Sequence, residues 1–223
     1  MSTSEPDRLL FRVSKIQLSS LCDADKSLEP LPPTLLPMVD AKVMVGPAFC
    51  ITVDDDHLAT YQAVVLAPPG SVIVIATKGG QKAIVGGLFS NEARRRGLRG
   101  FVVDGYMRDI YRDITKVGLP IWARGAHSAA GGMKVPYDGK KECVVFGQKV
   151  RNGDIVVADE DGVLIASRER IENAIAKAEE IERKEATLVR GVEQGIPFAQ
   201  LTNADEYLEK LKTENPIAFQ FYG

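Results

Sequence analysis

The sequence has few of the residues that bind zinc or form disulfide bonds. Its 223 residues include three cysteines and two histidines. Cys22, Cys50 and Cys143 are odd in number and widely spaced, and they lie far along the chain from His57 and His127. The spacing of a structural zinc site and a framework of paired cysteines are therefore both absent. Unpaired cysteines of this kind fit a reducing compartment.

Long apolar runs and an excess of charge of one sign are also missing. The first seven residues include acids where a secretory signal needs basic residues, and no apolar stretch is long enough to cross a bilayer. Lys and Arg number 28 against 30 for Asp and Glu, so the formal net charge is -2. No overall positive field attracts nucleic acid or an anionic membrane. We therefore expect a cytoplasmic protein whose main partner is neither nucleic acid nor a membrane.

Three common catalytic motifs do not occur. The chain has no Gly-x-x-x-x-Gly-Lys-Ser/Thr loop, and no Gly-x-Gly-x-x-Gly follows a strand. Phosphate-loop and dinucleotide-binding functions thus lack the backbone that holds the phosphates. A Gly-x-Ser-x-Gly elbow is missing as well, which argues against a serine hydrolase of that type.

The residues that are present predict a mixed α+β fold. Hydrophobic residues make up 45% of the chain, enough for one sizeable core. Ser71–Thr77 is a continuous, largely β-branched run, which indicates a strand buried on both faces. Residues 142–166 read as three strands separated by turns, the first of them at 142–150. Ser167 is expected to cap a long helix that Gly191 ends.

The length does not demand a second domain. We interpret residues 1–223 as a single domain, with an N-terminal helix and loop at 1–40 and a peripheral C-terminal tail at 191–223.

The most informative stretch runs from Gly86 to Asp109. Gly86-Gly87 opens a predicted helix, whose N-terminus offers backbone N–H groups and the positive end of a dipole to an anion. The strand that follows leads to Arg108-Asp109. Adjacent side chains on a strand point to opposite faces, so this pair serves one site only if it lies past the strand end, and Asp104-Gly105 is expected to supply the turn.

Such a set of groups suits a 2-oxo acid bound to a metal ion. The carboxylate of Asp109 can hold a divalent cation, the N–H groups can hold the substrate carboxylate, and the guanidinium of Arg108 can hold the oxygen on which charge develops. Structural interpretations stay open beside this one. Gly86-Gly87 can be a tight turn that feeds a helix, and Arg108 and Asp109 can form a structural ion pair or part of a solvated helix face.

Two further groups also have alternative interpretations. Asp54, Asp55 and Asp56 precede a predicted helix, where caps are a commoner use of acids than metal binding. His127 stands next to a Gly-rich loop and could be a catalytic acid, although a lone histidine is more often structural.

Four segments resemble those of the RraA-like family, which contains the 4-hydroxy-4-methyl-2-oxoglutarate/4-carboxy-4-hydroxy-2-oxoadipate aldolases and the regulator of ribonuclease activity A. The segments are Ala67–Val74, Gly86–Asp109, Gly118–Pro120 and Asn152–Val163. The resemblance implies a swivelling β/β/α-type domain with a C-terminal helix and tail. It also implies a homotrimer, sometimes a hexamer, with sites at the subunit boundaries.

The resemblance implies roles for individual residues. It places Mg²⁺ or Mn²⁺ on Asp109 and the substrate on Arg108, and it assigns the backbone N–H groups of Gly86, Gly87, Leu88 and Phe89 to the pyruvyl carboxylate. The aldolases of this family are similar to one another in having an aspartate where this chain has Gly87, and they use an acid from a neighbouring subunit's C-terminal region.

The expected activity is that of a divalent-metal-dependent lyase, with Arg108 and Asp109 as its catalytic residues. Its substrates would be 2-oxo acids, cleaved by decarboxylation of oxaloacetate or by retro-aldol cleavage of 4-hydroxy-2-oxo acids. Decarboxylation needs only the metal, the arginine and water. The alternative is a non-catalytic protein that binds and regulates a ribonuclease.

Overall fold

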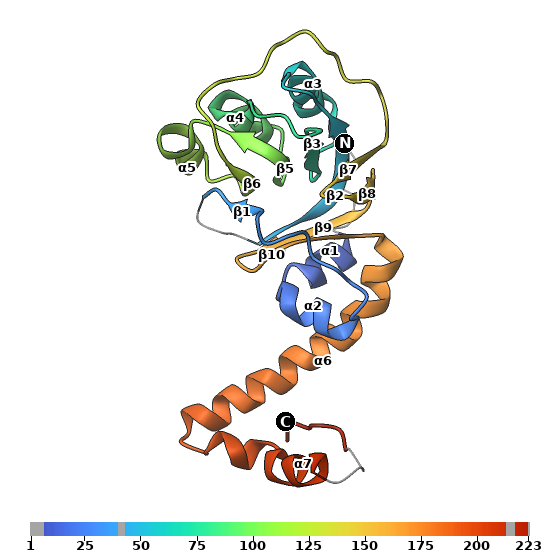
Figure 1. The fold of residues 1–223 in the computed structure, drawn as a ribbon, viewed down its shortest axis with the longest axis vertical. Coiled ribbons are helices and arrows are strands. Elements are labelled where there is room, and N and C mark those ends of the chain that lie inside the picture. Colours follow the sequence, from blue (N-terminus) through green and yellow to red (C-terminus); the bar gives the residue numbers. More distant parts are fainter. Residues whose placement is uncertain (1–6, 40–42, 213–216, 223) are drawn as a thin grey trace.

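The computed structural model describes residues 7–39, 43–212 and 217–222. Most of its strands form one mixed sheet in the order β1-β6-β5-β3-β2-β9-β10, with β4 paired to β5 (Figure 1). The bounds are β1 Leu36–Pro37, β2 Met44–Thr52, β3 Val72–Ala76, β4 Ala83–Val85, β5 Gly100–Met107, β6 Ile121–Ala126, β9 Ile155–Asp159 and β10 Gly162–Ala166. A separate hairpin consists of β7 Glu142–Val145 and β8 Gln148–Arg151.

Helices accompany the sheet and extend beyond it. They are α1 Arg8–Val13, α2 Leu18–Ala24, α3 Leu58–Leu66, α4 Gly87–Arg95, α5 Thr115–Val117, α6 Arg168–Glu193 and α7 Ala204–Leu211, with a π-helical turn at Ile110–Ile114 and a 3-10 turn at Phe198–Leu201. The prediction of a mixed α+β fold with a C-terminal helix and tail is confirmed.

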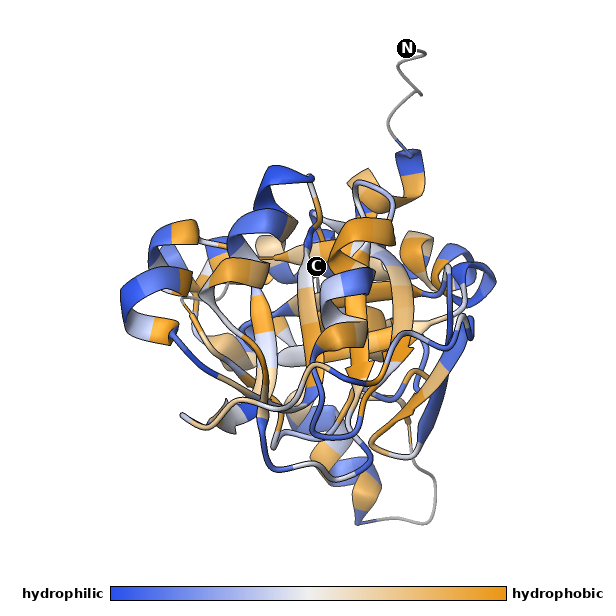
Figure 2. Ribbon diagram, turned by 90° about the horizontal axis from the view of Figure 1, so that it is seen from above, coloured by the Kyte–Doolittle hydropathy of each residue, from blue (hydrophilic) through white to orange (hydrophobic). Residues whose placement is uncertain are grey.

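Parallel pairing defines the centre of the sheet. Strand β3 pairs in parallel with β2 on one side and with β5 on the other, and β5 pairs in parallel with β6. All five residues of β3 are buried, as predicted for a strand covered on both faces. Figure 2 shows the central strands as mostly hydrophobic and the surrounding helices as mixed. Because parallel strands point the same way, the segments that leave β4 and β5 emerge at one edge of the sheet.

Strand β2 links this parallel region to the antiparallel one. Its residues 44–47 pair with β9, and its residues 48–52 pair with β3. Pro47, which has no backbone N–H to donate, is the last residue that pairs with β9. The antiparallel part then continues from β9 to β10 through a short turn.

The structure corrects two predictions in the C-terminal half. The segment 142–150 was expected to be one strand, but Phe146 and Gly147 have φ of 48° and 82° and turn the chain into a hairpin. Ser167 caps α6 through its Oγ, as predicted, but the helix continues through Gly191 to Glu193. A Cβ on Gly191 would lie 3.1 Å from the side chain of Leu201, so this glycine allows close packing of the tail.

Helix α6 carries the chain away from the sheet (Figure 1). Its buried residues Ile171, Ala174, Ile175 and Ala178 pack in one cluster with α1 and α2, whereas its C-terminal half projects toward α7. The segment after α6 contains the 3-10 turn and α7. Across the described ranges, no helix has the length and apolar character needed to cross a membrane.

Candidate active site at the ends of β4 and β5

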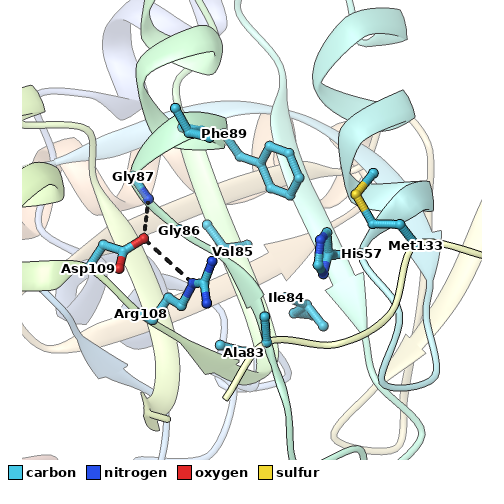
Figure 3. Close-up of a pocket in the computed structure, with 12 residues that line it drawn as sticks. His57, Ala83, Ile84, Val85, Gly86, Gly87, Phe89, Arg108, Asp109 and Met133 are labelled. Atoms are coloured by element: carbon cyan, nitrogen blue, oxygen red, sulfur yellow. Dashed lines mark hydrogen bonds and ion pairs between the residues drawn. The ribbon is translucent and has the colours of Figure 1, made fainter. Parts of the chain in front are cut away.

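A cavity of about 170 Å³ lies where β4 and β5 end (Figure 3). The segment from Ala83 to Phe89, which spans β4 and the start of α4, forms one wall. Arg108 and Asp109, which follow β5, form a second wall. The lining is completed by His57, which precedes α3, and by Ala130 and Met133 of the loop after β6. All the residues predicted to form the site, from Gly86 to Phe89 together with Arg108 and Asp109, therefore meet in one cavity.

The backbone turns at Asp109 rather than at Asp104-Gly105. Both of those residues lie inside β5, where Asp104 is in register with Ala76 of β3. Asp109 has φ 64° and ψ 27°, a left-handed conformation, and leads into the π-helical turn. The predicted position of Arg108 and Asp109 past the strand end is correct, but the predicted turn was wrong. A left-handed aspartate costs about 1–3 kcal/mol and is a feature often found at functional sites.

The N-terminus of α4 already faces a carboxylate of the protein. The backbone N–H of Gly87 donates a hydrogen bond of 3.1 Å to Oδ2 of Asp109, and Nε of Arg108 lies 3.6 Å from the same oxygen. The first N–H groups of any α-helix have no acceptor within the helix. Leu88 and Phe89, the next residues of this first turn, thus present such groups beside the cavity. Positive charge and N–H dipoles converge here, as an anionic ligand requires.

Ligand access to the pair is open. The side chains of Arg108 and Asp109 are 44% and 39% exposed, so the guanidinium and the carboxylate can both reach a molecule in the cavity. The interpretation of Arg108 and Asp109 as part of a solvated helix face does not hold, because Arg108 precedes the π-helical turn and Asp109 is the residue at its N-terminal cap.

Each of the two glycines makes room for a carboxylate. A Cβ on Gly86 would lie 2.8 Å from Oδ2 of Asp109. A Cβ on Gly87 would lie 2.7 Å from Cβ and 2.8 Å from Oδ2 of Asp113. Asp113 thus fills the volume into which a side chain at position 87 would extend. Asp113 was not predicted to belong to the site, and its four-residue spacing from Asp109 was the only available signal.

His57 is a second residue that was not predicted to belong to the site. Its ring packs edge-on against Phe89, with 5.7 Å between ring centroids. Burial lowers its pKa, Asp56 raises it, and the positive charge of Arg108 lowers it further. The pKa therefore lies below the ordinary histidine value of 6.5, and the imidazole is neutral at pH 7. Its Nδ1 is buried and has no hydrogen-bond partner among the described residues.

Two other groups are structural in this fold. Asp56 accepts hydrogen bonds from the backbone N–H groups of Leu58 (2.9 Å) and Lys134 (2.7 Å), so it fixes the start of α3 and the loop after β6. Nδ1 of His127 accepts a hydrogen bond of 3.1 Å from the N–H of Ala129 within its own loop. The capping interpretation of the acids before α3 therefore fits Asp56 better than a metal site does.

The residues of the cavity can bind a divalent cation that keeps most of its coordinated water molecules. Across the part of the chain that the structure describes, no three His, Cys, Asp or Glu side chains converge as a complete cage would require. Magnesium characteristically uses one or two carboxylates together with water and oxygens of the substrate. The Oδ1 of Asp109 accepts no hydrogen bond from the described residues, whereas Oδ2 is held by Gly87. One oxygen of Asp109 is therefore available to a cation.

Comparisons with known proteins agree with this architecture. The RraA-like family model, described as Aldolase/RraA, matches residues 18–165. A protein of Halalkalibacterium halodurans that is provisionally named 4-hydroxy-4-methyl-2-oxoglutarate aldolase is 32% identical over 219 residues, covering 95% of this chain and 98% of that protein.

Two solved structures share the fold at lower identity. An uncharacterized protein from Pseudomonas syringae pv. tomato superposes with a TM-score of 0.76 at 23% identity, over 89% of this chain and 98% of that chain. The RNA-processing inhibitor RraA from Thermus thermophilis gives a TM-score of 0.62 at 23% identity, over 68% of this chain and 92% of that chain. Since the family model covers the central sheet and every segment that forms the cavity, the chain belongs to the RraA-like family.

Proposed function

We propose that the protein is a divalent-metal-dependent lyase that cleaves 2-oxo acids. The observation that carries the proposal is the convergence of Arg108, Asp109 and the N-terminus of α4 in one cavity. These groups come from two neighbouring parallel strands, so the sheet itself holds them together. The name of the Halalkalibacterium relative supports an aldolase-type reaction at the coarse level.

The chain's own residues bind and orient the substrate. The N–H groups in the first turn of α4 hold the carboxylate of the 2-oxo acid, because the helix end offers unpaired donors and a positive dipole. The guanidinium of Arg108 holds the 2-oxo oxygen and stabilises the negative charge that develops there. Mg²⁺ or Mn²⁺, held by Asp109, would supply Lewis-acid polarisation of the same group. Cleavage leaves the part of the substrate that these groups hold as the enolate of pyruvate.

Two substrate types fit the proposal. Oxaloacetate loses CO₂ from its C4 carboxylate, and the electron pair of the C3–C4 bond passes into the enolate. In a 4-hydroxy-2-oxo acid the same C3–C4 bond breaks, and a carbonyl compound is released. Decarboxylation makes the smaller demand on the site, since it requires no base to remove a hydroxyl proton.

Removal of divalent metal is expected to abolish turnover of oxaloacetate above the non-enzymatic rate. The chain offers no lysine in the described lining of the cavity that could form a Schiff base instead. The test is the rate of pyruvate formation with EDTA and after Mg²⁺ is added back, with enzyme-free samples at the same metal concentration as controls. Full turnover in EDTA, or trapping of substrate on the protein by borohydride, would contradict the proposal.

We also propose that the protein assembles as a homotrimer or a hexamer, as the family resemblance implies. Leu88 and Tyr111, on the two segments that flank the site, have exposed fractions of 86% and 92% in the single chain. Large apolar side chains beside an active cavity are suited to a subunit boundary. Light scattering after size-exclusion chromatography is expected to give a multiple of three chains. If the protein is a monomer and remains fully active at the same concentration, the proposal that its sites lie at subunit boundaries is wrong.

A further inference from the structure

His57 occupies the side of the cavity that the proposed binding mode leaves for the far end of the substrate. Figure 3 shows its ring across the cavity from Arg108 and Asp109, between Phe89 and Ile84. A 2-oxo acid whose carboxylate reaches the start of α4 and whose 2-oxo oxygen reaches Arg108 must direct its C4 end away from that wall. The opposite wall is where His57 lies.

The backbone fixes the position of His57 but leaves its ring without a partner. Its N–H donates a hydrogen bond of 2.8 Å to the carbonyl oxygen of Gly132, which anchors the residue at the start of α3. The buried Nδ1 has no hydrogen-bond partner among the described residues. An unpaired buried polar atom is uncommon in a folded protein and is often found where a residue has a functional role. The other ring nitrogen, Nε2, also has no hydrogen-bond partner among the described residues but is not closed to solvent, so it is the nitrogen that a ligand in the cavity can reach.

The other carboxylates near the cavity are committed elsewhere. Both oxygens of Asp56 accept backbone N–H groups. Asp109 accepts the N–H of Gly87 with one oxygen and, under the proposed function, holds the cation with the other. Asp113 packs beneath Gly87 and is not among the residues that line the cavity. His57 is held neutral by burial and by the nearby positive charge of Arg108, so it can accept a proton at neutral pH.

We propose that His57 is the general base for retro-aldol cleavage of 4-hydroxy-2-oxo acids, an inference that rests on the proposed function. The imidazole takes the proton of the C4 hydroxyl, and the electrons of that O–H bond form the new carbonyl at C4. The C3–C4 bond breaks, and its electron pair passes into the enolate that Arg108 stabilises. The enolate takes a proton from water at C3 to give pyruvate, and His57 releases its proton to water. No oxidant or reductant is needed.

Decarboxylation of oxaloacetate has no hydroxyl proton to remove, so the two reactions depend differently on His57. In the His57→Gln variant we expect the ratio of the turnover number for 4-hydroxy-4-methyl-2-oxoglutarate to that for oxaloacetate to fall by about 10²-fold, at the lower end of the contribution of a positioned general base. Glutamine keeps hydrogen-bonding capacity but cannot serve as the base. Added imidazole should restore part of the cleavage rate in His57→Ala, and the melting temperatures of both variants should show that the fold is retained.

The second histidine provides a matched control and a measurement other than activity. His127 lies outside the cavity, and His127→Gln should leave the ratio of the two turnover numbers unchanged. With only two histidines in the chain, their ring resonances can be assigned by these variants. Adding 2-oxoglutarate, which has no C4 hydroxyl to lose, with Mg²⁺ should shift the His57 resonance and leave that of His127 in place.

The outcomes separate this inference from the proposed function. If the parent protein turns over neither substrate, the lyase proposal fails and the role of His57 fails with it. If the parent is active but His57→Gln leaves the ratio unchanged, the lyase stands and the base assignment is overturned. An unshifted His57 resonance at saturating 2-oxoglutarate would also overturn the assignment, because the far end of the ligand would then not reach the ring.

Discussion

Replacing Asp109 by asparagine is expected to lower turnover of oxaloacetate by about three orders of magnitude without unfolding the protein. A neutral amide lacks the charge that holds a hard cation, and the Lewis-acid contribution of such a cation is several kcal/mol, on the order of a thousandfold in rate. The backbone should tolerate the change. Asparagine adopts the left-handed conformation seen at Asp109 as readily as aspartate does, and its amide oxygen can still accept the N–H of Gly87.

Calorimetric titration with Mg²⁺ or Mn²⁺ measures the metal affinity directly, and the melting temperature reports on the fold. Asp138→Asn is a suitable control, since Asp138 pairs with Lys140 in a loop outside the cavity and should leave the titration unchanged. If the Asp109→Asn protein binds metal as the parent does, Asp109 is not the ligand and the proposed site is wrong.

Replacing Arg108 by lysine should reduce the turnover number far more than it changes KM. Lysine keeps the positive charge but loses the planar fork that can hold two oxygens in fixed geometry. The interaction is strongest where charge develops in the transition state, so its loss affects the rate more than substrate binding. Removal of one such contact typically lowers the rate by about 10²-fold to 10³-fold.

Arg95→Lys is the matched control for Arg108→Lys. Arg95 pairs with Glu92 on the exposed face of α4, and its replacement should leave turnover near that of the parent. If Arg108→Lys matches the parent in turnover and melting temperature, Arg108 has no role in catalysis and the proposed mechanism is wrong. A parent protein without lyase activity would instead favour the ribonuclease-binding function.

Local sequence pattern was sufficient for the elements that depend on burial and capping. The β-branched run at β3 and the cap of Ser167 were predicted correctly because each depends on a few neighbouring residues. The predicted turn at Asp104-Gly105 was wrong because that prediction also depended only on neighbouring residues. The pair has the composition of a turn, but parallel pairing of Asp104 with Ala76 of β3 keeps it in a strand, although the register with β6 shifts between Val103 and Tyr106. The carboxylate of Asp104 accepts a hydrogen bond from Arg124.

The candidate site was predictable where its residues belong to one helix and strand. Gly86-Gly87 and Arg108-Asp109 meet because β4 and β5 are parallel neighbours, and the chain order of glycine pair, helix and strand already implies this. His57 belongs to a segment after β2, and it reaches the cavity only because β2, β3 and β5 lie side by side. That neighbourhood is a property of the sheet order, which the sequence pattern alone does not specify. The position of Asp113 likewise depends on a π-helical turn, which no local pattern predicted.

The packing of Asp113 against Gly87 has a consequence for how relatives of this protein can diverge. The two positions share one volume, so an acidic side chain can enter it from residue 87 or from residue 113, but not from both without steric overlap and repulsion between like charges. Either substitution alone leaves a clash or an empty space, whereas the paired exchange conserves both volume and charge. The effects of substitutions at positions 87 and 113 are therefore coupled, because the cost of each depends on the residue at the other position.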